Sequence, residues 1–147
     1  MDERIKEYLK HLNRYYLLLL ESKKLSYDDF KSSPLHQGST ERFLQLAIES
    51  CLNIGNRLIA LAQLSKPVST PGTYADIFRE MNRLGVVDHD FTQQLINMAR
   101  FRNRLVHLYW DIDSEAVYTF LQNNLNDFKM FQQKVVEYLK QNKLPSI

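Results

Sequence analysis

One stretch of the chain gathers side chains that are suited to acid–base and phosphate chemistry. Within residues 98–113 stand three arginines, an asparagine and a histidine, which are Arg100, Arg102, Asn103, Arg104 and His107. At helical spacing Asn103 and His107 are neighbours on one face, whereas Arg102 falls on the apolar stripe that carries Leu95 and Met98. The charged guanidinium of Arg102 therefore points where an ordinary helix buries leucine. Asp111 follows His107 by four residues, so its carboxylate can orient the His107 imidazole if the helix continues that far.

Arginine beside histidine, without a cluster of metal-binding residues, favours cleavage of a phosphodiester bond without a metal ion. Arg102 can hold the non-bridging phosphate oxygens and stabilise the charge of the transition state, while His107 moves a proton. RNA is the expected substrate because its 2′-hydroxyl is an internal nucleophile. One histidine is one proton carrier short of an acid–base pair, so two copies of the chain across a homodimer interface would complete the site.

The same residues also allow a purely structural interpretation. Arg102 would then pair with an internal acid such as Glu49, because a buried arginine needs a partner. His107 would be a hydrogen-bonded core imidazole, and the other two arginines would lie at a solvated helix end. Spacing alone does not decide between the two interpretations.

Hydrophobic periodicity predicts helices throughout the chain, joined by short connections. The predicted helices span about residues 5–24, 39–64 with a start at Ser39 or slightly earlier, 74–84, 89–109 and 114–141. Ser26 is predicted to cap a short turn over residues 26–30, and Asp88 to cap a helix. Gly85 is a predicted helix stop, and Gly55 a point where another helix comes close. The expected architecture is one all-α domain over residues 1–147, an up-and-down bundle of about five helices.

Composition excludes several classes of protein. The 147 residues are 44% hydrophobic and 24% charged with a formal net charge of +2, which is typical of a globular chain and too small to identify a nucleic-acid binder. Cys51 is the single cysteine, so neither a disulfide within the chain nor a multi-thiolate metal site is expected.

His11, His36 and His89 are scattered, and no Gly-rich phosphate loop is present. No apolar run is long enough to span a membrane and no secretory signal is visible, so we expect a cytoplasmic protein without metal or cofactor.

The motif Arg102-Asn-Arg-Leu-Val-His107-Leu-Tyr109 resembles the R-x4-H-x-Y motif of the HepT-like toxins within the HEPN superfamily. The segments from Glu41 to Ser50 and from Tyr74 to Phe78 are similar to the same family, and the resemblance extends over about residues 5–138. Leu108 departs from the small residue that is common at its position.

The resemblance implies a homodimer with the motif helices at the interface, and a metal-independent ribonuclease that is the toxin of a type VII toxin–antitoxin system. Arg102 and His107 carry over as catalytic residues, Asn103 as a supporting residue, and Arg100 and Arg104 as candidates for binding the RNA. The implied partner is a nucleotidyltransferase-fold (MNT) antitoxin that adds AMP to Tyr109. The alternative is a non-catalytic helical module that docks the nucleotidyltransferase. The sequence offers no recognisable stacking platform for bases, so it predicts no preferred RNA.

Overall fold

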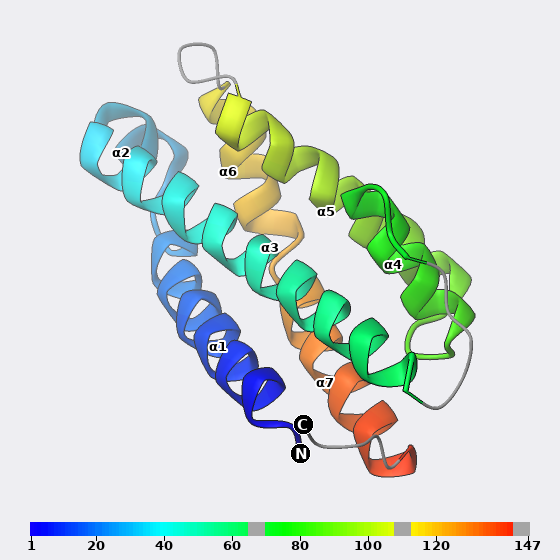
Figure 1. Ribbon diagram of the computed structural model, residues 1–147. Helices are drawn as coiled ribbons and strands as arrows, with labels where there is room; N and C mark the ends of the chain where they lie inside the picture. Colours follow the sequence, from blue (N-terminus) through cyan, green and yellow to red (C-terminus); the bar gives the residue numbers. More distant parts are fainter. Residues whose placement is uncertain (65–69, 108–112, 143–147) are drawn as a thin grey trace.

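The computed structural model describes residues 1–64, 70–107 and 113–142, and every regular element in these ranges is a helix (Figure 1). The helices are α1 (Glu3–Lys23), α2 (Tyr27–Ser32), α3 (Pro34–Ala62), α4 (Tyr74–Arg83), α5 (His89–His107), α6 (Ser114–Asn123) and α7 (Asn126–Gln141). The predicted all-α class is therefore confirmed.

Several predicted helix ends are confirmed by local hydrogen bonds. The Ser26 hydroxyl accepts from the Asp29 amide at 3.1 Å, and the Asp88 carboxylate accepts from the Phe91 amide at 2.8 Å. Both bonds satisfy backbone N–H groups that a helix N-terminus leaves without intrahelical partners. Gly85 follows α4 with φ of 85°, a conformation that costs glycine little.

The described residues form seven helices rather than about five, for two reasons. The segment after Ser26, expected to be a capped turn, forms the short helix α2. The last predicted helix is divided into α6 and α7 at Asn124 and Leu125. In addition, α3 begins earlier than Ser39, at Pro34, where the missing N–H of proline costs no intrahelical hydrogen bond.

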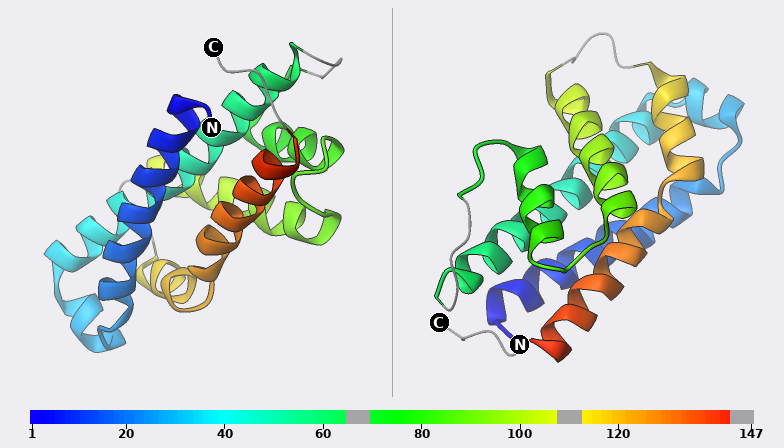
Figure 2. Two further views of the ribbon diagram at one scale, coloured as in Figure 1. Left: turned by 90° about the horizontal axis from the view of Figure 1, so that it is seen from below. Right: turned by 90° about the vertical axis from the view of Figure 1, so that its right-hand side faces the viewer.

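Helix α3 lies at the centre of the bundle and packs against α1, α4 and α5 (Figure 1). Helices α6 and α7 pack against α1, and both views of Figure 2 place the start of α1 near the end of α7. The largest fully buried rings of the core are Phe30, Phe78, Phe128 and Phe131. Cys51 is fully buried on α3, and burial raises the pKa of its thiol well above the usual range, so it is a packing residue.

Gly55 allows α4 to approach α3 closely, as its place in the sequence predicts. A Cβ at this position would lie 2.5 Å from Ile77 Cγ2 and 2.9 Å from Met81 Sδ, both on α4. Helix α4 in turn lies beside α5, as the right-hand view of Figure 2 shows. The contact at Gly55 therefore lets α4, which carries Tyr74, lie close against α3 while it also packs against α5.

Candidate functional site

The motif residues occupy the last two turns of α5, and their side chains point to different sides. His107, the last residue of α5, is exposed, as is Asn103 one turn before it. Arg102 points inward toward α3, and its side chain is only 15% exposed. The inward position of Arg102 agrees with its predicted place on the apolar stripe.

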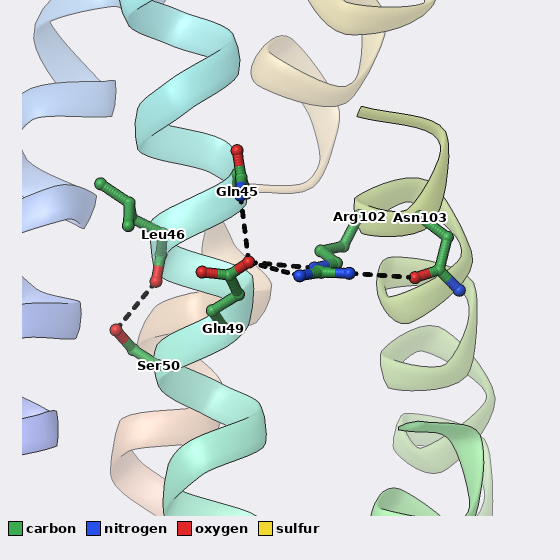
Figure 3. Close-up of polar contacts among 6 residues, drawn as sticks. All are labelled: Gln45, Leu46, Glu49, Ser50, Arg102 and Asn103. Carbon is green, nitrogen blue, oxygen red and sulfur yellow. Dashed lines mark hydrogen bonds and ion pairs between the residues drawn. The ribbon is translucent and has the colours of Figure 1, made fainter. Parts of the chain in front are cut away.

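Arg102 is held by Glu49, which projects from the middle of α3 (Figure 3). Its Nε and Nη2 atoms donate to the same carboxylate oxygen, Glu49 Oε1, at 3.1 and 2.6 Å. Gln45, one turn earlier on α3, donates from Nε2 to this oxygen at 3.1 Å. The pairing of Arg102 with Glu49, one part of the structural interpretation, is thus present in the fold.

Two further contacts fix the guanidinium. Nη1 of Arg102 donates to Asn103 Oδ1 at 3.4 Å, a long hydrogen bond, as drawn in Figure 3. The guanidinium carbon also lies 5.1 Å from the centre of the Tyr74 ring at the start of α4, within the range of a cation–π interaction. Residues from three helices therefore define where this positive charge stands.

His107 opens onto a pocket of about 460 Å³ between α3, α4 and α5. The pocket is lined by Asn56 from α3, Tyr74 and Ile77 from α4, and Asn103 and His107 from α5. Among the residues that the structure describes, none forms a side-chain hydrogen bond with His107. The imidazole is available to an outside group, so the interpretation of His107 as a satisfied core residue is wrong.

Arg100 and Arg104 lie on a different part of the α5 surface. They line a groove of about 230 Å³ together with Phe101 and with Phe120 of α6. The Arg104 guanidinium lies 5.8 Å from the centre of the Phe101 ring, and Arg100 donates to Asn97 at 3.4 Å. Both arginines are exposed, but the structure does not bring them into the pocket that holds His107.

Other predicted features are accounted for as follows. Leu108, Tyr109 and Asp111 lie outside the described residues. His11 is exposed and pairs with Glu7 at 3.2 Å, and His36 and His89 are exposed. Within the described ranges, no group of three or more His, Cys, Asp or Glu residues is placed to hold a metal ion. The helices of these ranges also include none with the length and apolar character needed to cross a membrane.

Sequence reasoning did not identify Asn56, Gln45 or the role of Tyr74 in this region. In the sequence, Tyr74 belongs only to the segment from Tyr74 to Phe78 that is similar to the family. The signal that links it to the motif is tertiary, because its ring meets Arg102 through the crossing of α4 and α5.

Comparison with known proteins gives matches over most of the chain. The family described as "Ribonuclease HepT-like" matches residues 5–135. A "tRNA nuclease HepT" of Aphanizomenon flos-aquae is 28% identical over 137 residues, which cover 93% of this chain and 86% of the relative. An "mRNA nuclease HepT" of Shewanella oneidensis is 28% identical over 102 residues, or 69% of this chain and 74% of the relative.

Solved structures share the fold. A tri-AMPylated Shewanella oneidensis HEPN toxin, solved in complex with an MNT antitoxin, has a TM-score of 0.83 at 23% identity and covers 93% of this chain and 99% of its own. A toxin–antitoxin structure with AMP-PNP has a TM-score of 0.81 at 22% identity, covering 92% of this chain and 99% of that one. The helical arrangement described above is therefore one that these solved chains also adopt.

Proposed function

Because the chain belongs to the Ribonuclease HepT-like family, we propose that it is a metal-independent endoribonuclease and the toxin of a toxin–antitoxin pair that acts in the cytoplasm. The two similar relatives are named as a tRNA nuclease and an mRNA nuclease, which supports RNA as the substrate class. The observation that carries the proposal is the exposed His107 imidazole, five residues after an arginine that Glu49 and Tyr74 hold in place.

The proposed reaction is attack of an RNA 2′-oxygen on the adjacent phosphorus. The bond from phosphorus to O2′ forms and the bond to O5′ breaks, which leaves a 2′,3′-cyclic phosphate and a 5′-hydroxyl. One imidazole accepts the proton of the 2′-hydroxyl, and a second gives a proton to the leaving 5′-oxygen. Arg102 binds the non-bridging oxygens, whose negative charge grows in the transition state. Asn103 supports Arg102 through its hydrogen bond with Nη1.

The second imidazole comes, in this proposal, from the partner of a homodimer. Each chain supplies one Arg102 and one His107, and the exposed face of α5 that carries Asn103 and His107 meets its copy across a cleft. Arg100 and Arg104 then bind RNA phosphates that leave the cleft along the neighbouring groove.

The proposed regulator is a nucleotidyltransferase-fold antitoxin that adds AMP to Tyr109. One solved relative of this fold is a tri-AMPylated HEPN toxin in complex with an MNT antitoxin, which supports this part of the proposal. An anionic adduct two residues from His107 would repel a substrate phosphate and occupy its place.

Substitution of His107 by alanine tests the proposal. We expect RNA cleavage by His107→Ala to fall about 10²- to 10⁴-fold, the usual contribution of a general acid or base, with helicity and dimerisation unchanged. His36→Ala, which removes another exposed histidine from α3, is the matched control and should cleave like the parent. All rates are measured with a chelator present, and the products are checked for the cyclic phosphate.

Two results would contradict the proposal. Cleavage by His107→Ala at the parental rate would remove His107 from the reaction. RNA left intact by the parent protein at high concentration would instead indicate a non-catalytic module that docks the nucleotidyltransferase.

A further inference from the structure

The pocket beside His107 contains an aromatic ring whose part in the proposed cleavage chemistry is limited to its contact with Arg102. Tyr74 is 40% exposed, and it is the one aromatic side chain of this exposure among the residues that the structure describes. It is the first residue of α4, where the Thr73 hydroxyl caps the helix by accepting from the Asp76 amide at 3.2 Å. The Arg102 guanidinium lies over the ring, so the position of the Tyr74 ring is held both by the helix that it begins and by this cation.

The rest of the pocket offers an apolar wall and amide groups. Ile77, one turn after Tyr74, is 3% exposed and forms part of the lining. Asn56 is exposed on α3, and its side-chain amide makes no hydrogen bond with any described part of the chain. Asn103 uses its Oδ1 to accept from Arg102, which leaves its Nδ2 donors for an outside acceptor.

This combination matches the chemistry of an unpaired nucleobase. A flat ring gains stacking energy from an exposed aromatic side chain, and its edge carries the donors and acceptors that asparagine amides complement. The volume of about 460 Å³ lies within the range of sites for small ligands. A base in this pocket would bring its own phosphate to His107, which lines the same space.

We propose that Tyr74 and Asn56 form a nucleobase pocket that receives one unpaired base of the RNA next to the bond that is cleaved. The base packs against the Tyr74 ring, and Asn56 and Asn103 contact its edge. A base-paired nucleotide cannot enter, so the pocket directs cleavage to loops and single strands. This assignment goes against the expectation that the chain offers no stacking platform, and it rests on the proposed ribonuclease function.

Binding of uncleavable RNA tests the pocket separately from catalysis. The probes are short homopolymers with 2′-O-methyl ribose, which lack the nucleophile, one for each of the four bases, and an abasic oligomer with the same backbone. Fluorescence anisotropy gives the affinity of each probe for the full chain. The measured quantity is the ratio of affinities for each homopolymer and for the abasic oligomer.

We expect the parent protein to prefer at least one homopolymer over the abasic oligomer by about tenfold or more, from the energy of stacking one base. Tyr74→Ala should lose most of this preference; because Tyr74 also contacts Arg102, the readout is the ratio of base to abasic affinity and not the abasic affinity itself. Tyr74→Phe keeps the ring and should keep the preference. Tyr27→Ala is the matched control, because Tyr27 also begins a helix after a capping hydroxyl and lies near a lysine, but on α2.

Two outcomes would overturn the pocket: no preference of the parent protein for bases over the abasic oligomer, or a Tyr74→Ala protein that keeps the full preference. Equal weakening of all probes by Tyr74→Ala would show a role in folding or in placing Arg102, and would also overturn it. A protein that shows the Tyr74-dependent preference but does not cleave ordinary RNA would refute the proposed ribonuclease and leave the nucleobase pocket standing.

Discussion

Two arginine–carboxylate pairs join α3 to its neighbours, and both use the Nε and Nη2 atoms of the arginine. In the first pair, Arg57 of α3 donates to Asp2, the residue before α1, at 3.1 Å to Oδ1 and at 2.8 Å to Oδ2, which ties α1 to α3. In the candidate site, Arg102 donates twice to Glu49 Oε1 and ties α5 to α3. The difference between the pairs lies in the oxygens that each carboxylate uses and in their exposure.

In the pair of Arg57 and Asp2, both carboxylate oxygens are engaged within the fold, and we call it the closed pair. Both oxygens of Asp2 bind Arg57, and Oδ1 also accepts the backbone amides of Arg4 and Ile5 at 3.1 Å as the cap of α1. The Asp2 side chain is only 4% exposed. Both oxygens of this carboxylate are therefore engaged within the fold, and almost none of the carboxylate is exposed.

In the pair of Arg102 and Glu49, one carboxylate oxygen has no donor among the described residues, and we call it the open pair. The Glu49 side chain is 28% exposed, and three N–H donors of described residues converge on its Oε1 while its Oε2 receives none. Nη1 of Arg102 has only the long bond to Asn103. We infer that Glu49 orients Arg102 but does not consume it, so a guanidinium edge stays available for a phosphate. An arginine paired with an acid can therefore serve the fold or the site, and the exposure of the carboxylate and the use of its two oxygens distinguish the two.

The strongest test of this comparison replaces each arginine by lysine. Lysine keeps the charge but loses the planar fork that binds two oxygens at once. We expect Arg102→Lys to lower the rate of RNA cleavage about 10²- to 10³-fold, the loss typical for one transition-state donor, with little change in melting temperature. Arg57→Lys should instead lower the melting temperature and leave cleavage per folded molecule unchanged. Initial rates and thermal melts of the two variants would refute the distinction if both proteins lost only stability.

A smaller effect is expected from the carboxylate in the site. Glu49→Gln keeps an oxygen that can accept from Arg102 but removes the charge that holds the guanidinium. We expect kcat to fall about tenfold because a displaced catalytic group reacts slowly, with KM changed less. Asp2→Asn is the matched control, and should keep kcat while losing stability. A Glu49→Gln protein that cleaves normally but melts earlier would place Glu49 with the structural pairs.

Periodicity and caps were sufficient to predict most helices but not the division between α6 and α7. Leu121, Leu125 and Phe128 are all buried, and their spacing of four and three residues continues the helical pattern across the division. No glycine or proline interrupts residues 114–141, and the asparagines at 123 and 124 are the one local signal for the end of α6, weaker than the hydrophobic pattern that continues past them. The direction of the chain there is set by packing against α1, which the local pattern does not contain.

The residues of the candidate site, like the helices, could be predicted only where a local pattern in the sequence marks them. Arg102 stood out because a charge on an apolar stripe is locally inconsistent, and an internal acid such as Glu49 followed from the need for a partner. Tyr74 carries no such local inconsistency. Its contact with Arg102 depends on the crossing of α4 and α5, and on the close approach of α4 to α3 that Gly55 allows.

The smallest expected effect concerns the pH dependence of the closed pair. The hydrogen bond from Arg57, helped by the backbone amides, holds the pKa of Asp2 below its usual value. A carboxyl group whose pKa is lower in the folded than in the unfolded chain adds stability above the unfolded pKa of about 3.9. That stability is lost as the pH falls through the lower, folded value.

Asp2→Asn removes this titration while keeping a side chain that can cap α1. We therefore expect the free energy of unfolding of the parent protein to exceed that of Asp2→Asn at neutral pH. The gap should narrow below about pH 4, as Asp2 of the parent becomes protonated. Urea unfolding of both proteins over this range measures the gap, which high salt should reduce only in part because the pair is largely buried. A gap that stays constant down to acid pH would show that the charge of Asp2 adds no stability, and that the closed pair stabilises the fold through its hydrogen bonds alone.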